Sequence, residues 1–510
     1  MNFKPEKKTI ALSDIKATLS AQQSIQAEVN LPDYCSDIKR ILKCIIIPGI
    51  TSVNVSAEKI TATGIADIKL IYVSEKDKID CYESQRDISV TAESKDISDN
   101  TIVSAKAKTN YVNCRATSQR RVSIEGNIGV SFELTETATK DIFVSCSGQG
   151  IQLKKEKTAY ENLICQREKI FDMGETVQIP ADKGIVGKIL RTSAYAVLDS
   201  KKAVSDKLLI KGQLYTNILY CTDSDEGKTA LFRHSMPISQ IIDLQGIDEN
   251  TNCNVSLCVR CITARRKSES SSEGSLVEIG AKVAAMCKCT DKGEISTVED
   301  CYSTSHEIKT EYSLEEFLCP VESISRQKTV KKTFEMPSGE ISDIIDLWCS
   351  DASATMKGEG KTAKAQCSLT LCILYRNGKG VPEYTEKNAD FTFETALRES
   401  YEYLKCKILC QMRNAEASII SKDKIEVRLE TGINADIYSC VSKRILKDLQ
   451  ILSKKESTDN TALTIYFPVQ GEKIWDIARR YSTTAEAIKA ENGLEGETVD
   501  GKNMILIPAV

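Results

Sequence analysis

The stretch that decides the fold is GIADIKLIY, from Gly64 to Tyr72, because its pattern occurs twice more in the chain. The copies are GQLYTNILY, ending at Tyr220, and CSLTLCILY, ending at Tyr375. Alternation with a period of two is typical of a strand with one buried face. The side chains that share the face of each tyrosine lie two, four and six residues before it: Leu70, Ile68 and Ala66; Ile218, Thr216 and Leu214; Ile373, Leu371 and Leu369.

A second landmark occurs at a nearly constant spacing before each of these tyrosines. It is a short segment closed by a proline, and Pro32, Pro180 and Pro337 precede the three tyrosines by 40, 40 and 38 residues. Each copy also ends in further strands, expected at Val122–Phe132, Leu276–Met286 and Ile425–Ile437. Two landmarks at matching spacing in three copies indicate tandem copies of one domain.

The copies are rich in Val, Ile, Thr and Tyr that alternate with polar residues. Runs of strands with few helices favour antiparallel sandwiches over βαβ units. We therefore predict a mainly β protein with three tandem antiparallel β-sandwich-like repeats, over residues 1–150, 151–310 and 311–453. Short helical turns are expected after the proline landmarks, for example at Ser36–Lys43 and Ile341–Trp348.

A polar linker, residues 454–462, leads to a miniature domain over residues 463–510. From Ile465 it reads IYFPVQGEKIWDIARRYSTTAEAIKAENGLEGETVDGKNMILIP. A strand, a turn at Gly471, two short helices with a stop at Asn492-Gly493, and a last strand closed by Pro508 are predicted. This stretch resembles a LysM module, a small βααβ domain best known for binding glycans that contain N-acetylglucosamine.

The LysM resemblance implies a binding surface on two loops. The residues expected to bind a partner or a glycan are Gln470, Gly471, Glu472 and Lys473, with Asn492, Leu494 and Glu495 opposite. Trp475, Ile477 and Tyr481 are expected to support this surface from the core. The sequence departs from the usual module at Glu472-Lys473 and Asp500-Gly501, in loops that normally border the glycan groove, and at Pro468 in the expected first strand.

The first repeat opens with LPDYCSDI, from Leu31 to Ile38. Tandem domains that open in this way and end in a LysM module resemble the SPOCS-domain proteins of clostridia, which include the SipL-type spore-coat morphogenetic proteins. The resemblance implies a non-enzymatic adaptor in the mother-cell cytoplasm that tethers coat proteins to the forespore surface, with the LysM docking a coat-basement ATPase protein. The repeats would contact other coat proteins or further copies of the chain. The alternative is a peptidoglycan-binding protein in which the β domains are spacers.

The composition excludes several other classes. A net charge of −4 gives no basic footprint for nucleic acid. No apolar run reaches the length of a membrane span, and the N-terminus lacks the apolar segment of a secretory signal. The twenty cysteines are therefore interpreted as reduced. One CxxC, Cys258 to Cys261, and two histidines predict no metal site, although Cys287 and Cys289 leave a thiol cluster open as an alternative.

No catalytic constellation is found. Two GKT triplets, at residues 227–229 and 360–362, have Thr222 and Thr355 where a phosphate loop needs glycine. His234 and His306 have no equivalents in the other repeats and no visible Ser or Cys partner for a catalytic dyad. Asp33 and Asp37 are expected to cap the next turn. We predict no enzyme and no cofactor, and a hydrolase in the β region is the remaining rival.

Overall fold

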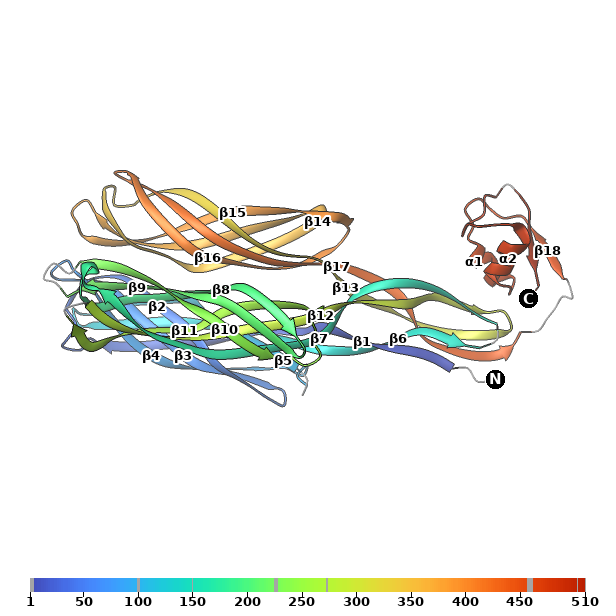
Figure 1. The fold of residues 1–510 in the computed structure, drawn as a ribbon, viewed down its shortest axis with the longest axis horizontal. Helices are drawn as coiled ribbons and strands as arrows, with labels where there is room; N and C mark the ends of the chain where they lie inside the picture. Colours follow the sequence, from blue (N-terminus) through green and yellow to red (C-terminus); the bar gives the residue numbers. More distant parts are fainter. Residues whose placement is uncertain are drawn as a thin grey trace.

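The computed structural model describes residues 4–98, 101–148, 150–223, 228–271, 274–455, 462–501 and 503–509. Strands make up 80% of the chain and helices 4%. The predicted fold class, antiparallel β repeats followed by a small domain with two helices, is therefore confirmed. Three β bodies lie at one end of the molecule, and the helical domain lies at the other (Figure 1).

The first repeat is a sandwich of two three-stranded antiparallel sheets. One has the order β1-β6-β5 and the other β2-β3-β4. The inner faces bury one core that includes Ile68, Leu70, Tyr72 and Phe132. The strands are β1 (Lys4–Asn30), β2 (Ile38–Ser56), β3 (Lys59–Ser74), β4 (Ile79–Glu93), β5 (Thr101–Ala116) and β6 (Arg121–Ser147).

The second and third repeats have the same plan. In the second, the sheets are β7-β12-β11 and β8-β9-β10; in the third they are β13-β17-β16 and β14-β15. Ser342 and Ser350 in the first half of β14 donate hydrogen bonds to backbone carbonyl oxygens in its second half, so β14 folds back on itself and supplies the missing strand. The strands are β7 (Ile151–Pro180), β8 (Val186–Val204), β9 (Lys207–Thr222), β10 (Thr229–Asp243), β11 (Asn252–Ser271), β12 (Gly274–Ser303), β13 (His306–Glu335), β14 (Ile341–Asn377), β15 (Pro382–Tyr401), β16 (Leu404–Ser421) and β17 (Lys424–Lys454).

The predicted helical turn is present after Pro180, as the 3-10 helix η1 (Ala181–Lys183), but the turns predicted at Ser36–Lys43 and Ile341–Trp348 are wrong. Apart from a turn before Ile38, both segments are extended and begin β2 and β14. In β2 this segment pairs with the tyrosine-bearing strand, as Ile41 opposite Tyr72 shows. Pairing with a neighbouring strand satisfies the backbone and overrides a short helix-like spacing of apolar residues.

The two sequence landmarks meet in space. Tyr72, Tyr220 and Tyr375 are fully buried. The hydroxyl of each forms a hydrogen bond with the loop that follows the proline landmark: Tyr72 donates to the Ser36 carbonyl oxygen at 3.0 Å, Tyr220 donates to that of Lys183 at 2.9 Å, and Tyr375 accepts from Ser338 Oγ at 3.0 Å. A buried hydroxyl needs such a partner, which accounts for the constant spacing.

The LPDYCSDI loop is held by one arginine. Arg120 Nη1 donates to Asp37 at 2.6 Å, and Arg120 Nη2 donates to the Pro32 carbonyl oxygen at 2.8 Å. Asp33 lies farther away, at 3.7 Å from Arg120 Nη2. Asp37 therefore pairs with Arg120 across the loop, and the expected helix cap is not formed because β2 follows directly.

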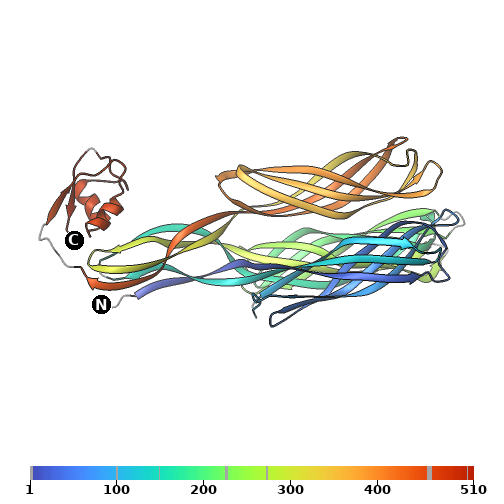
Figure 2. The same cartoon turned by 180° about the vertical axis from the view of Figure 1, so that it is seen from behind.

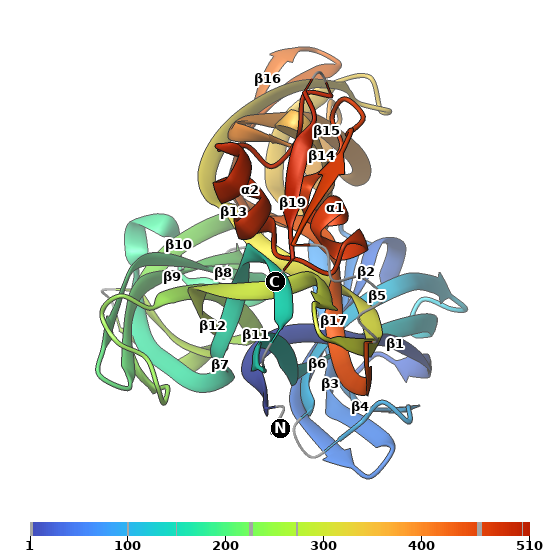
Figure 3. The ribbon, with the colours of Figure 1, turned by 90° about the vertical axis from the view of Figure 1, so that its right-hand side faces the viewer.

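Seen end-on, the three repeats surround one axis (Figure 3). The outer faces of their tyrosine-bearing strands meet there in a shared core that includes Ile71, Leu219, Cys372 and Leu374. These residues occupy the alternate positions of the repeated strand. The predicted face of the strand is buried within each sandwich, and the last alternate positions on its other face are buried between the sandwiches.

Ion pairs cross the contacts between repeats, and three of them lie close to this shared core: Lys188–Asp80 at 2.5 Å, Lys43–Glu386 at 2.5 Å and Arg191–Asp346 at 2.7 Å. Burial of Asp80 acts to raise its pKa, but hydrogen bonds from Lys188 Nζ and the Ser36 amide outweigh burial, and its pKa is lowered. The side chains of Arg191 and Asp346 are only 6% and 2% exposed. Each charge of the Arg191–Asp346 pair is therefore far more dependent on the other than are the charges of the two more exposed pairs.

The first and last strands of each repeat run on beyond the sandwich as a two-stranded ribbon. The three ribbons pack together into a stalk (Figure 2). Its interior is apolar and draws on all three repeats, through Ile10, Ile142, Tyr160, Ile295, Phe317 and Ile445. A second cluster, with Phe143, Val298 and Leu446, continues this interior.

The LysM-like domain has the predicted order of elements. It comprises β18 (Leu463–Tyr466), α1 (Ile474–Arg480), α2 (Ala485–Asn492) and β19 (Ile505–Pro508). Thr484 caps α2 by accepting a hydrogen bond from the Ala487 amide at 3.1 Å, and Gly493 ends it with φ of +62°. Pro468 lies after β18 and not within it. The residues expected as the linker lie partly outside the described residues, which omit 456–461.

Candidate functional site

The first predicted binding loop of the C-terminal domain lies against the segment that leads into β19. The Gly471 amide donates to the Val499 carbonyl oxygen at 2.8 Å, and the Val499 amide donates to that of Glu472 at 3.0 Å. Gly471 has φ of +80°, a conformation that favours glycine. The backbone therefore fixes the position of the first loop against the segment that leads into β19.

Two of the predicted binding side chains are engaged inside the domain. Glu472 accepts hydrogen bonds from the Tyr466 hydroxyl at 3.0 Å and from the Val469 amide at 3.2 Å. Asn492 joins α2 to β19, because its amide nitrogen donates to the Leu506 carbonyl oxygen and its oxygen accepts from the Leu506 amide. Both side chains therefore position the loops.

The other predicted loop side chains face outward or pack at the rim. Gln470, Lys473 and Glu495 are exposed, and Leu494 packs against the domain core. Polar side chains at the ends of two fixed loops are suited to hydrogen bonding with a ligand or with a polar protein surface.

The three residues expected in the core occupy different depths. Ile477 is fully buried. Trp475 is half-buried at the edge of the core. Tyr481 is 38% exposed, and its ring meets that of Tyr466 edge-on at 5.5 Å. Only Ile477 therefore lies wholly inside the domain.

Trp475 faces the stalk. Its indole Nε1 donates to Asp300 Oδ2 in β12 at 2.9 Å, and Arg479 Nη1 binds the same oxygen at 2.7 Å. The Tyr302 ring meets the Trp475 ring edge-on at 4.8 Å, and its hydroxyl donates to the Thr483 carbonyl oxygen at 2.8 Å. Burial raises the pKa of Tyr302, so this hydroxyl stays protonated. The LysM-like domain is therefore docked on the second repeat.

Replacing Tyr302 with Ala should detach the domain from the stalk, because a buried aromatic side chain at the centre of a contact contributes about 2 kcal/mol or more. We expect the fluorescence of Trp475 to shift to longer wavelength and to become more accessible to acrylamide, measured in a Trp348→Phe background since the chain has two tryptophans. Tyr302→Phe, which keeps the ring, should give a smaller change. Unchanged Trp475 emission in Tyr302→Ala would rule out the docking.

Around β18 the small domain carries an exposed apolar strip that the sequence analysis missed. Four alternate residues along and beyond β18 point outward together with Met504, which precedes β19. Their exposed fractions are 42% for Leu463, 58% for Ile465, 75% for Phe467, 72% for Val469 and 55% for Met504. The alternation of apolar residues from residue 463 to residue 469 could have revealed this strip from the sequence. Exposed apolar side chains that gather in this way mark interaction sites.

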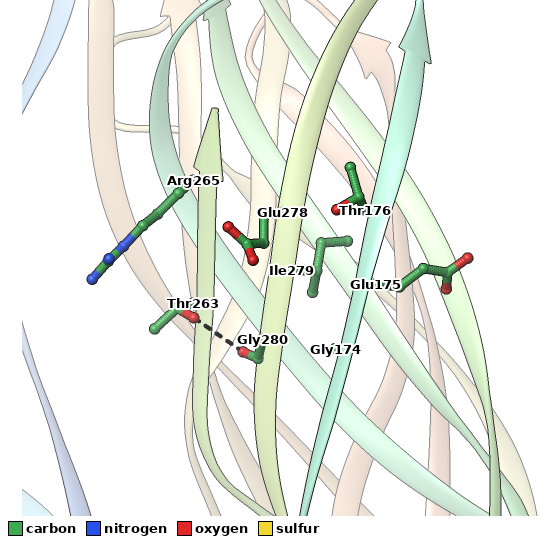
Figure 4. Close-up of a pocket in the computed structure, with 8 residues that line it drawn as sticks. All are labelled: Gly174, Glu175, Thr176, Thr263, Arg265, Glu278, Ile279 and Gly280. Carbon is green, nitrogen blue, oxygen red and sulfur yellow. Dashed lines mark hydrogen bonds between the residues drawn. The ribbon is translucent and has the colours of Figure 1, made fainter. Parts of the chain in front are cut away.

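A hollow on the second repeat does not bring ionisable groups together. It lies on the sheet β7-β12-β11, with a volume of about 590 Å³. Gly174 and Gly280 are opposite each other in neighbouring strands and leave it without side chains at its floor. Arg265, Glu278 and Glu175 point in different directions around it (Figure 4). Glu175 is instead paired with His234, at 2.9 Å.

Within the described ranges, no group of three or more His, Cys, Asp or Glu residues could hold a metal ion. His306 Nδ1 lies 2.9 Å from the hydroxyl of the adjacent Ser305, a contact within one turn. In the same ranges, none of the helices has the length and apolar character needed to cross a bilayer.

Fold and site together define a modular binding protein, with repeated β sandwiches and a terminal module that presents a surface. The SipL SPOCS domain matches residues 37–117 and 186–265, and the LysM domain matches residues 469–508. The chain therefore has the SPOCS plus LysM architecture. The matched SPOCS segments lie in the first two repeats, and the third repeat shares their two-sheet plan. No curated protein and no solved structure matches the chain.

Proposed function

We propose that this protein is a non-enzymatic spore-coat adaptor that works in the mother-cell cytoplasm at the forespore surface. Its LysM domain docks a coat-basement ATPase protein, while the three repeats contact other coat proteins or further copies of the chain. SPOCS and LysM domains are non-catalytic binding domains of sporulation-related proteins, which supports this class of function.

The observation that carries the proposal is the exposed apolar strip on a domain that is fixed to the stalk. Phe467 and Val469 are each more than 70% exposed, and Ile465 and Met504 are each more than half exposed. An aromatic residue at the centre of an apolar patch suits a protein partner. Docking through Asp300 and Tyr302 holds the strip in one orientation, which reduces the entropy lost when a partner binds.

Co-purification from sporulating cells tests the proposal. Full-length chain should recover the ATPase partner, and Phe467→Glu should lower its recovery at least about tenfold, because losing an aromatic hot spot costs about 2 kcal/mol or more. A matched control is Glu491→Lys on α2, an exposed charge change away from the strip. Equal recovery of the ATPase partner by the Phe467→Glu variant and by the unchanged chain would contradict the proposed surface.

The alternative is a peptidoglycan-type glycan bound at the LysM loops. A pulldown of the full-length chain with insoluble peptidoglycan distinguishes the two functions. The adaptor predicts little binding, and the glycan reader predicts saturable binding that is lost on replacing exposed Gln470 and Lys473 with Ala. Binding of that kind, together with no recovered protein partner, would favour the glycan reader.

A further inference from the structure

Three cysteines form a row across neighbouring strands of the second repeat. Cys289 in β12 is the register partner of Cys253 in β11 on one side and of Cys165 in β7 on the other. Directly opposed residues of antiparallel strands project from the same face of the sheet. The three thiols are therefore neighbours in pairs, with Cys289 in the centre.

The central pair is in direct contact inside the core. The Sγ atoms of Cys253 and Cys289 are 2.6 Å apart. Cys253 is 4% exposed and Cys289 is fully buried, and Cys165 packs against the same core. Cys287 lies on this face too, two residues before Cys289, but its register partners are Val255 and Arg167. The exposed Cys258 is opposite Ala284 and takes no part in the row.

We propose that Cys253 and Cys289 are a site of disulfide formation, with Cys165 as a third thiol that exchanges with the pair. A low-molecular-weight disulfide is the oxidant. One cysteine thiolate attacks it to give a mixed disulfide and one released thiol, and the second cysteine then displaces the other thiol. One Sγ–Sγ bond forms, the S–S bond of the reagent breaks, and the two protons end on the two thiols released.

The geometry of the sheet permits this bond. Opposed residues of antiparallel strands have Cα atoms about 4.5–5.5 Å apart, within the range of about 4.4–6.8 Å that disulfides span. Attack by Cys165 on Cys289 Sγ would release Cys253 and move the bond to the other neighbour, with no net oxidation. Cys289 can thus be linked to β11 or to β7.

Burial sets the rate and the persistence of the bond. Burial raises the pKa of Cys289, and the pKa of Cys165 is raised for the same reason. Few thiolates form at neutral pH, so oxidation is slow, but a bond enclosed in the core is equally shielded from reductants. Oxidation would therefore lock the long sheet of the second repeat into a persistent state.

The test is oxidation of the full-length chain with oxidised glutathione at about pH 8, followed by alkylation in denaturant and non-reducing peptide mapping. We expect the Cys253 peptide to be joined to the Cys289 peptide. In Cys253→Ser the link should move to Cys165, and in Cys289→Ser both links should disappear.

Cys287→Ser is the matched control, since it removes a thiol of equal burial on the same strand and should leave the Cys253–Cys289 link in place. Alkylated, unlinked Cys253 and Cys289 after complete exposure to the oxidant would overturn the proposal. So would a dominant link that bypasses Cys289. Circular dichroism of each variant establishes that the sandwiches are folded, and mapping needs no assay of partner binding.

Discussion

Replacing Arg191 with Met should lower the free energy of unfolding by about 3–5 kcal/mol, because it leaves the Asp346 carboxylate buried without its partner. Arg191 Nε donates to Asp346 Oδ2 at 2.7 Å, and the guanidinium lies over the Trp348 ring, 4.7 Å from its centroid. The pair joins the second repeat to the third at the shared axis. Denaturant titration of the full-length chain measures the change.

Two further variants separate the charge from the packing. Arg191→Met combined with Asp346→Leu should recover most of the loss, since apolar residues can replace a buried ion pair at little cost. Lys43 is 29 residues before Tyr72, as Arg191 is before Tyr220, and its partner Glu386 is 42% exposed. Lys43→Met should therefore cost only about 0–1 kcal/mol. Equal losses for Arg191→Met and Lys43→Met would show that burial does not distinguish these pairs.

Replacing Gly64 with Ala should destabilise the first repeat by about 1–3 kcal/mol or more, as expected when extra volume is forced into a packed site. The added Cβ would overlap the carbonyl oxygen of Gly49 and crowd the Cα of Ile50, and backbone atoms cannot move aside as a flexible side chain can. Gly64 is opposite Ile50, where a bulge in β2 brings the two strands close. Thermal or denaturant unfolding gives the measurement.

Gly174→Ala is the control for Gly64→Ala. Gly174 is also a strand glycine, but an added Cβ would meet only the Ile279 carbonyl oxygen at 3.5 Å, an ordinary contact. Its replacement should be neutral or stabilising by about 0.4–1 kcal/mol through the unfolded chain. Gly212 has the place of Gly64 in the second repeat and the same crowding, against Val197. A tolerated Gly64→Ala would mean that the bulge relaxes.

Predictions based on alternation within one segment were reliable. The faces of the strands that end at Tyr72, Tyr220 and Tyr375 are buried, and α1, α2 and the strands of the LysM domain lie within a few residues of their expected positions. The helix-like spacing at Ile341–Trp348 failed because that segment finds its partner in the second half of β14. A local period cannot identify such a partner.

The candidate site was less accessible to sequence reasoning. Glu472 and Asn492 occupy the predicted loops, yet their hydrogen bonds with Tyr466 and Leu506 turn them inward. Trp475 was expected to act within its own domain, and its indole instead reaches Asp300, 175 residues earlier in the chain. These assignments depend on which atoms complete each side chain's hydrogen bonds, and a loop motif does not specify them.

By itself, the sequence determined the strand periodicity, the three copies and the terminal βααβ module, because burial against an immediate neighbour leaves a regular pattern along the chain. The tertiary structure decided the shared axis, the stalk, the docking of Trp475 and the thiol row of Cys165, Cys289 and Cys253. Those contacts join segments far apart in the chain, and surfaces that meet in this way need no common period. Their energies come from shape, desolvation and pairing in the assembled fold.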